Sequence, residues 1–374
     1  MTVRTYGARR TLLAALALLL TACGGAASAP AQPTPAATAA GQTGADSGNP
    51  YTALCPPSSA PRSMVLAIWG GPHESIMKEG LAGFTQLTGI QVELTLDSAR
   101  DRLTKLNAEK GSPSIDVAMV SIDSVPRLLA TGVVMPAATD VPNVADMAPV
   151  ARVDGGYGIS LLQEGIGYNP QYVTTPPTSW SDLLKPEWAG HLAWPSMPNA
   201  TSLAVLTMIA KANGGSEANF QPGIDAVARI APGVKTFYAQ EPQIEPQYQS
   251  GDVWIAPAIA GLVQSMKEKG GPVAVSIPKE GGPILMNVAT IPVGVKNLGC
   301  SKALVGWLLS EAVQRPYAEQ LFYGPANHAV TLPPDVKQRV YPQDEASAVT
   351  IDWKTISEKQ SDILDQWNRQ VVGR

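Results

Sequence analysis

The chain has 374 residues, a formal net charge of −4 at pH 7, 45% hydrophobic residues and 16% charged residues. Its length suffices for two folded lobes, and the composition is typical of a globular protein. A mildly acidic chain without a basic run is unsuited to nucleic acid, so we expect no such partner. Its three cysteines and three histidines are too scattered for a structural zinc site, and we expect neither a metal nor a cofactor.

Residues 1–22 have the features of a secretory signal peptide. Arg4, Arg9 and Arg10 precede the apolar run Leu12–Leu20. This run is about ten residues long, half of what a helix needs to span a bilayer. A basic region followed by a short apolar core is typical of an export signal. We therefore expect residues 1–22 to be removed on export.

The ending Leu-Thr-Ala-Cys at Cys23 resembles the lipobox of bacterial lipoproteins. The resemblance implies cleavage before Cys23 and a lipid on its sulfur. The alternative is a plain secreted protein with an incidental cysteine. Because each buried CH₂ contributes roughly 0.8 kcal/mol, a multiply acylated cysteine would anchor the chain to a membrane. We expect the protein at the outer face of the cytoplasmic membrane, or in the periplasm.

Residues 23–61 are expected to form a tether after the lipidated cysteine. From Gly24 to about Pro50 the chain consists of Ala, Pro, Gly, Thr, Ser and Gln with few other residues and a single charge, Asp46. Such a segment buries too little apolar area to offset the entropy that ordering would cost. We therefore expect the tether to be flexible.

Residues 65–123 alternate between apolar strands and amphipathic helices. We expect strands at 65–68, 91–96 and 115–120, and helices at 75–87 and 100–110. This alternation predicts an α/β fold with a parallel sheet and ligands at the carboxyl ends of its strands. The loops at those ends supply six candidate ligand residues: Trp69, Gly70, Gly71, Asp97, Ser121 and Asp123. Alternatively, Trp69 is a packed core residue.

Further strands are expected along the rest of the chain. Tyr157–Asn169 is an apolar strand in which either Gln163 or Glu164 faces a ligand. Residues 241–249 are polar and interrupted by prolines, so we expect a loop there. The remaining expected strands cover residues 251–256, 273–278 and 284–288.

The stretch from Ser179 to Ser202 predicts a short helix, a strand and a second helix. Ser179 or Ser181 caps the first helix, and Pro186 ends it. A strand at 191–194 is followed by a polar loop and a helix at 203–213. Strand, loop and helix N-terminus together direct unpaired N–H groups at a ligand, although an ordinary α/β connection has the same pattern. The candidate residues here are Asn199, Thr201 and Ser202.

The segment 180–190, with the pattern W-x-D-L-x-x-P-x-x-x-G, resembles the extracellular solute-binding proteins of ABC importers, spermidine/putrescine type. Residues 84–92, 278–292 and 308–314 carry further similarity, and the resemblance covers about 65–370. It implies the two-lobed, type 2 periplasmic-binding-protein fold, with a mostly parallel sheet flanked by helices in each lobe and crossover strands between them.

The resemblance also divides the chain. Lobe one comprises residues 62–164 and 289–330, and lobe two comprises residues 165–288. The C-terminal segment 331–374 carries apolar residues at helical spacing, including Trp353 and Trp367. We expect it to form a helix that packs on the body of the protein.

The function implied by the resemblance is delivery of a small-molecule solute to the permease subunits of an importer, by a monomer. Polyamine-type relatives hold cations with carboxylates and aromatic rings. Here Asn287 and Leu285 stand where those relatives carry an aspartate and a tryptophan, and residues 195–202 contain no acid. A small polar or zwitterionic solute, polyamine-like or amino-acid-derived, is therefore favoured over a long dication. Asn287 and Tyr323 complete the candidate site.

In this hypothesis the ammonium group of the solute lies near Asp123 or Glu164, and its anionic end lies at residues 199–202. A purely anionic solute is the alternative. An enzyme on the same scaffold is a second alternative, but the chain contains no G-x-S-x-G, H-E-x-x-H or Walker motif. We therefore expect no catalytic residues and no turnover.

Cys55 and Cys300 remain once Cys23 is lipidated, in a chain exported to an oxidising compartment. Both are expected in lobe one, and we expect them to form a disulfide. The alternative is two unpaired thiols, with Cys300 as a small buried apolar residue.

The lipid anchor is directly testable. Cys23→Ser removes the sulfur that would carry the lipid, so the protein should be released from membranes into the periplasm or medium. Membrane fractionation with fatty-acid labelling measures this. A mutant that stays on the membrane, with a wild type that takes up no label, would contradict the lipoprotein hypothesis.

Overall fold

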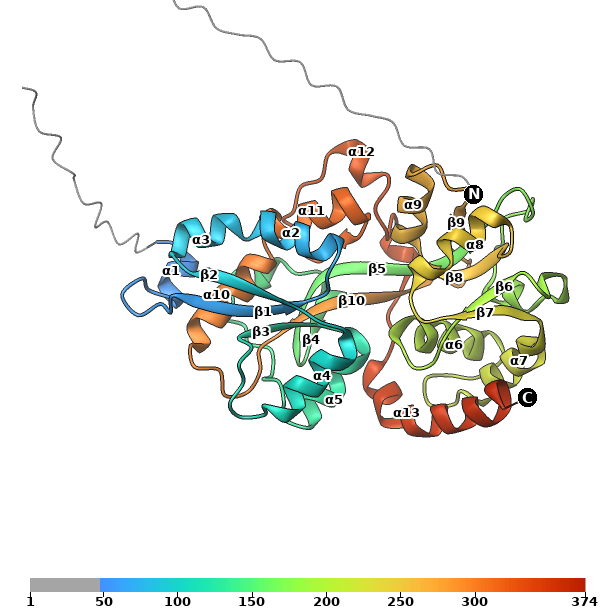
Figure 1. The fold of residues 1–374 in the computed structure, drawn as a ribbon, viewed down its shortest axis with the longest axis horizontal. Coiled ribbons are helices and arrows are strands. Elements are labelled where there is room, and N and C mark those ends of the chain that lie inside the picture. Colours follow the sequence, from blue (N-terminus) through green and yellow to red (C-terminus); the bar gives the residue numbers. More distant parts are fainter. Residues whose placement is uncertain (1–47, 374) are drawn as a thin grey trace, which may run out of the picture. The chain divides into compact units, whose positions relative to one another are not determined.

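One continuous path of hydrogen-bonded strands runs through the structure, a computed structural model that describes residues 48–373 (Figure 1). Its order is β2-β1-β3-β10-β5-β8-β6-β7, and β4, β9, β11 and β12 pair at its sides. The strands are β1 (Ser63–Ile68), β2 (Gln91–Leu96), β3 (Val117–Ser121), β4 (Arg152–Val153), β5 (Gly156–Tyr168), β6 (Leu192–Pro195), β7 (Val234–Tyr238), β8 (Ile255–Ile259), β9 (Ala274–Ser276), β10 (Gly282–Thr290), β11 (Gly324–Pro325) and β12 (Ala348–Val349).

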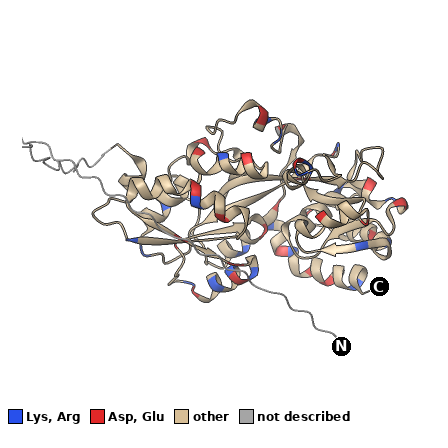
Figure 2. Ribbon diagram, turned by 45° about the horizontal axis from the view of Figure 1, so that its top comes forward, with Lys and Arg blue, Asp and Glu red and all other residues tan. Residues whose placement is uncertain are grey.

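Helices flank both halves of this path (Figure 1). They are α1 (Pro50–Leu54), α2 (Pro72–Gly80), α3 (Ala82–Thr88), α4 (Ala99–Ala108), α5 (Val125–Ala130), α6 (Ala200–Ala212), α7 (Gln221–Ile230), α8 (Glu245–Ser250), α9 (Ala260–Glu268), α10 (Leu298–Leu308), α11 (Glu311–Leu321), α12 (Pro334–Lys337) and α13 (Trp353–Trp367). Acidic and basic residues are interspersed along several of them (Figure 2), as in the ion pairs of Lys78 with Glu74 and Arg315 with Glu311.

The two lobes each have their own sheet. In lobe one, β1 pairs in parallel with β2 and β3, while β10 runs antiparallel to β3 and β5. In lobe two, β6 pairs in parallel with β7 and β8, while β5 runs antiparallel to β8 and β9. The two-lobed α/β fold is thereby confirmed.

Strand β5 belongs to both sheets. Its residues Tyr157 to Gln163 pair with β10, and the next five, Glu164 to Tyr168, pair with β8. All of its side chains are buried, which agrees with its near-continuous apolar sequence. The lobes are therefore joined at Gln163 and Glu164, within the strand that the sequence predicts at 157–169.

Two expectations about local structure are wrong. The single helix expected at 75–87 is two helices, α2 and α3, which meet at Leu81. The loop expected at 241–249 contains α8, because its proline lies in the first turn, where a helix does not need the missing N–H. Tyr248, which is fully buried, fixes α8 to the core of lobe two.

Ser179 caps a helix, as the sequence predicts, although the helix is 3₁₀ rather than α. Its hydroxyl accepts from the N–H of Ser181 at 3.2 Å, and Asp182 accepts from the N–H of Ser179 at 3.0 Å. This reciprocal capping begins the helix Trp180–Leu184. Trp180 and Leu183 point from it into the core.

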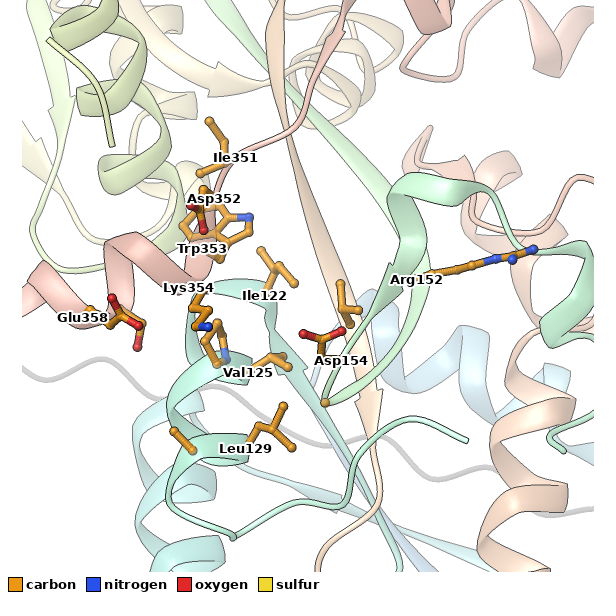
Figure 3. A pocket seen from close by; sticks show the side chains of 15 residues that line it. Ile122, Val125, Leu129, Arg152, Asp154, Ile351, Asp352, Trp353, Lys354 and Glu358 are labelled. Atoms are coloured by element: carbon orange, nitrogen blue, oxygen red, sulfur yellow. The ribbon is translucent and has the colours of Figure 1, made fainter. Parts of the chain in front are cut away.

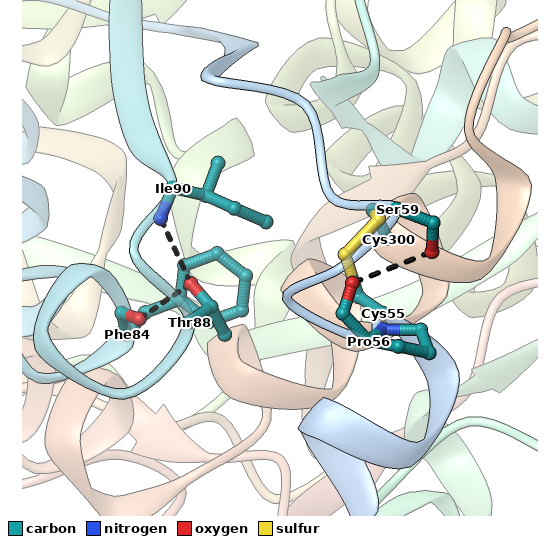
Figure 4. The surroundings of a disulfide bond; sticks show 7 residues. All are labelled: Cys55, Pro56, Ser59, Phe84, Thr88, Ile90 and Cys300. Carbon is teal, nitrogen blue, oxygen red and sulfur yellow. Dashed lines mark hydrogen bonds between the residues drawn. A yellow bond between two sulfur atoms is a disulfide. The ribbon is translucent and has the colours of Figure 1, made fainter. Parts of the chain in front are cut away.

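Cys55 and Cys300 are joined in a disulfide, with their Cα atoms 4.6 Å apart (Figure 4). The bond links the end of α1 to the first turn of α10. Gly299 is needed there, because a Cβ would lie 2.3 Å from the carbonyl oxygen of Leu54. Asn143 donates to the hydroxyl of Tyr51 at 2.9 Å, so this part of the expected tether is folded onto lobe one.

The bond also closes a long loop. It joins residues 245 positions apart, and closing a loop of that size stabilises the folded state by up to about 5 kcal/mol in the chain-entropy account.

The expected signal peptide, residues 1–22, and the expected lipidation site, Cys23, lie outside the described residues.

The C-terminal segment contacts both lobes. Its strand β12 pairs in parallel with Gly282 and Pro283 of β10. The start of α13 packs against α5, and the turn that follows α13 packs against α7, where Gln221 donates to Gln370 at 3.1 Å. Across residues 48–373, no helix combines the length and apolar composition that spanning a bilayer requires.

Candidate functional site

Trp69 follows β1 and lies at the carboxyl edge of the lobe-one sheet. Gly70 and Gly71 continue the loop and are exposed, and Gly71 adopts φ +69° as the N-cap of α2. A residue with a side chain would be strained in that conformation. The half-buried Trp69 ring lies close to two side chains. The guanidinium carbon of Arg102 is 4.7 Å from its centroid, and the His73 ring centroid is 5.5 Å away.

Arg102 is fully buried and paired with Asp97. Its Nη2 lies 2.6 Å from Oδ1 of Asp97 and donates to the carbonyl of the same residue at 3.1 Å. Its Nη1 donates to the carbonyl of Met119 at 2.6 Å. Arg102 is not among the site residues predicted from the sequence. The spacing carried a signal, because Arg102 and Leu106 are four apart on one helix face and are the buried residues of α4.

His73 connects Trp69 to two tyrosines of lobe one. Its Nδ1 lies 3.0 Å from the hydroxyl of Tyr317, whose ring stacks on that of Tyr323 with centroids 6.3 Å apart. Burial, with a smaller effect of the Arg102 charge, lowers the pKa of His73 to about 4. The imidazole is therefore neutral at neutral pH. The Trp69 cluster is thus defined by six residues: Trp69, His73, Asp97, Arg102, Tyr317 and Tyr323.

The Trp69 cluster borders lobe two. Gly261, at the start of α9, approaches it so closely that a Cβ would lie 2.7 Å from the carbonyl oxygen of Leu321 and 3.1 Å from Cδ1 of Tyr323. Trp69, Asp97 and Tyr323, three of the predicted residues, are therefore brought together at the boundary between the lobes.

A second group gathers where β3, β10 and β5 lie side by side. Asn287 is opposite Ser121 on one side and Ser160 on the other, and its side chain donates to the Ser160 hydroxyl at 3.1 Å. Asp123 follows β3 in the 3₁₀ helix Ile122–Ser124. The Asp123 cluster is thus defined by four residues: Ser121, Asp123, Ser160 and Asn287.

The carboxylate of Asp123 is only partly compensated. The residue as a whole is half-buried, but its Oδ1 is enclosed and has no hydrogen-bond partner among the described atoms. Burial raises the pKa of Asp123, and a hydrogen bond with Ser121 offsets part of that rise. A group of opposite charge at Oδ1 would supply the missing interaction.

Glu164 lies at the joint between the two sheets. Gln163, its neighbour, donates to the carbonyl and hydroxyl of Ser347 at 2.9 and 3.0 Å, so it faces the C-terminal segment. Successive side chains of a strand point to opposite faces. The fully buried Glu164 therefore shares its face with Ser160 and, on the neighbouring strand, with Asn287.

In lobe two, Asn199 and Ser202 cap α6. Asn199 Oδ1 accepts from the N–H of Ser202 at 2.8 Å, and the Ser202 hydroxyl accepts from the N–H of Asn199 at 3.0 Å. Their polar atoms are engaged within the helix, a role different from the solute contact that we expect from sequence. Thr201 between them is buried. Helix α6 packs against β10.

Two described cavities are lined by residues outside both the Trp69 cluster and the Asp123 cluster. One of about 910 Å³ is lined by Leu161, Ile284, Met286 and parts of the C-terminal segment. Another, of about 400 Å³, lies between α5, the turn before β5 and the start of α13, where Figure 3 shows Ile122 and Trp353 among its lining side chains. The Trp69 cluster lines neither. Within residues 48–373, no three His, Cys, Asp or Glu side chains are grouped as metal ligands would be.

Residues 81–342 match the family described as bacterial extracellular solute-binding proteins. The chain belongs to this family. The resemblance seen at residues 180–190 is thereby confirmed, and the chain is an extracellular solute-binding protein. One relative, the spermidine/putrescine-binding periplasmic protein of Escherichia coli (strain K12), is 26% identical over 280 residues, which are 71% of this chain and 80% of that protein.

Solved structures share the fold. An ABC transporter structure from Clostridium perfringens has a TM-score of 0.73 and 22% identity over 82% of this chain and 99% of that one. The spermidine/putrescine ABC transporter substrate-binding protein of Streptococcus pneumoniae has a TM-score of 0.67 and 22% identity over 83% of this chain and 100% of that one. Identities this low support the fold alone.

Because the carboxylate of Asp123 is buried, replacing it with a neutral amide should stabilise the folded protein, by an amount that depends on pH. Because the folded pKa of Asp123 is raised, its favourable contribution is present below the unfolded value of 3.8 and is lost as the pH rises through the folded pKa. Asp123→Asn should therefore raise the free energy of unfolding at pH 7 by about 1 kcal/mol, and the gain should shrink as the pH falls towards 4. Urea unfolding at several pH values measures it.

Asp116→Asn is the matched control. Burial also raises the pKa of Asp116, but its Oδ2 accepts from the N–H of Val65 at 2.8 Å. An amide there loses part of that interaction, so this variant should gain no stability. If both variants were equally destabilised at pH 7, the charge of Asp123 would already be balanced within the fold, which would contradict this prediction.

Proposed function

We propose that the solute is a small polar or zwitterionic molecule, polyamine-like or amino-acid-derived, which binds between the lobes with an ammonium group at Asp123. The observation that carries the proposal is the enclosed Oδ1 of Asp123, which has no partner among the described atoms. It lies at the carboxyl end of a parallel strand, where α/β sheets bind ligands. A carboxylate in that setting favours a cationic partner.

The neighbours of Asp123 suit a small polar ligand. Ser121, Ser160 and Asn287 offer hydroxyl and amide groups, and Glu164 contributes a buried acid on the same side of β5. The relative from Escherichia coli is named for spermidine and putrescine, both of which carry ammonium groups. That name supports an ammonium-bearing solute for this chain.

The start of α6 supports an anionic group at the other end of the solute. This helix has 13 residues, and the aligned peptide dipoles leave partial positive charge at its N-terminus. The loop before it, residues 195–199, contains no acid that would oppose an anion. A purely anionic solute held by α6 alone is the second candidate.

We further propose that the mature chain is a monomer anchored through a lipid on Cys23, outside the cytoplasmic membrane, where it hands its solute to permease subunits. The lipobox-like sequence supports the anchor, and the periplasmic location of the named relatives supports the compartment. The protein releases its solute unchanged and catalyses no reaction. Turnover of a bound solute would favour the enzyme alternative.

Removal of the Asp123 carboxylate tests the site. Asp123→Ala should weaken solute binding by about 1.5–3 kcal/mol, the range for a hydrogen bond to a charged group. Calorimetry against a panel of diamines, amino acids and dicarboxylates measures affinity and names the solute. Asp116→Ala, at the other end of the same strand, is the control and should bind as the wild type does. Equal affinity of Asp123→Ala and wild type would remove Asp123 from the site.

A further inference from the structure

Arg102 places a buried positive charge directly beside Trp69 and Asp97 in the Trp69 cluster, at the boundary between the lobes. Its side chain has no exposed surface, so it does not itself touch a solute in this conformation. Its Nη1 and Nη2 atoms are held by the carbonyl groups of Met119 and Asp97. The charge is thus fixed in position, and it acts on a solute only through its neighbours.

The first neighbour is Asp97. The sequence predicts this carboxylate as a ligand of a cationic group. In the structure its Oδ1 lies 2.6 Å from Nη2 of Arg102, and its side chain is only 14% exposed. Breaking a buried ion pair by withdrawing one partner is strongly unfavourable. Asp97 therefore cannot turn to an ammonium group without leaving Arg102 uncompensated.

The second neighbour is Trp69. A tryptophan face attracts cations, and this is one way to hold an ammonium group. Here the guanidinium carbon of Arg102 is 4.7 Å from the ring centroid, so one face is already occupied by a cation. An ammonium group on the other face would be repelled by that charge. His73, neutral because burial and Arg102 lower its pKa to about 4, adds no negative charge.

We propose that Arg102 determines which charge a solute may carry at the boundary between the lobes: by pairing with Asp97 and covering one face of Trp69, it makes the Trp69 cluster unsuited to a second ammonium group. Within the proposed class, the protein therefore favours amino-acid-derived solutes with one ammonium group and discriminates against diamines of the same length. This inference rests on the proposed function, since it assumes that the first ammonium group is held at Asp123.

Two four-carbon probes separate charge from length: 4-aminobutyrate, with one ammonium group, and putrescine, with two. Calorimetry on the full-length protein gives the ratio of their dissociation constants. The wild type should bind 4-aminobutyrate more tightly. Arg102→Met, which frees Asp97 and Trp69, should shift the ratio towards putrescine by about tenfold or more.

Two further variants distinguish charge selectivity from damage to the fold. Asp97→Asn leaves Arg102 uncompensated, so the ratio should move further towards 4-aminobutyrate. The double variant Asp97→Asn/Arg102→Met removes both charges and should return the ratio to within about threefold of the wild type. A merely structural role predicts that both probes lose affinity equally. If Arg102→Met does not fold, Asp97→Asn alone carries the test.

The outcomes separate the inference from the function on which it rests. A wild type that prefers putrescine, or a ratio that stays unchanged in both single variants, overturns the role of Arg102 and leaves solute binding intact. A wild type that binds neither probe overturns the proposed solute class, and the inference with it.

Discussion

Strand β5 is the constraint on which the two-lobed arrangement depends. Its 13 residues must satisfy backbone hydrogen bonds in one sheet up to Gln163 and in another from Glu164 onwards. The ends of β1, β3 and β10 are consequently held at a fixed place beside the boundary between the lobes, and the polar groups of both clusters lie there.

A buried charge at this boundary needs an opposite charge, which comes either from another residue or from a bound solute. Arg102 and Asp97 compensate each other within the fold, which explains how an arginine with no exposed surface is tolerated. Asp123 has no such partner at Oδ1. The carboxylates that follow β2 and β3 therefore differ: Asp97 is ion-paired within the fold, and Asp123 is not.

Periodicity predicts much of the fold, because strands and helices over residues 65–123 differ clearly in the spacing of their apolar residues. The pattern at 180–190 predicts the family, and the capping role of Ser179 follows from its residue type. The loop expected at 241–249 is wrong because prolines end some helices and begin others, and only tertiary packing of Tyr248 decides which.

The site is harder to predict, since sequence places residues at strand ends but does not pair their side chains. Asp97 and Asp123 look alike in the sequence, and only Arg102, four residues before a buried leucine, distinguishes them in the structure. Asn199 and Ser202 similarly look like solute ligands, whereas their polar atoms cap α6. Whether such a side chain contacts the solute or another group of the protein depends on its position in the fold, which these sequence patterns do not give.

A solute that bridges the two lobes should change the distance between them. Spin labels on Ala108→Cys in α4 and Arg229→Cys in α7, both exposed, report that distance in a Cys23→Ser background. A solute held by both lobes should give a shorter and narrower distance distribution when the solute found by calorimetry saturates the protein. An identical distribution with and without saturating solute would contradict it.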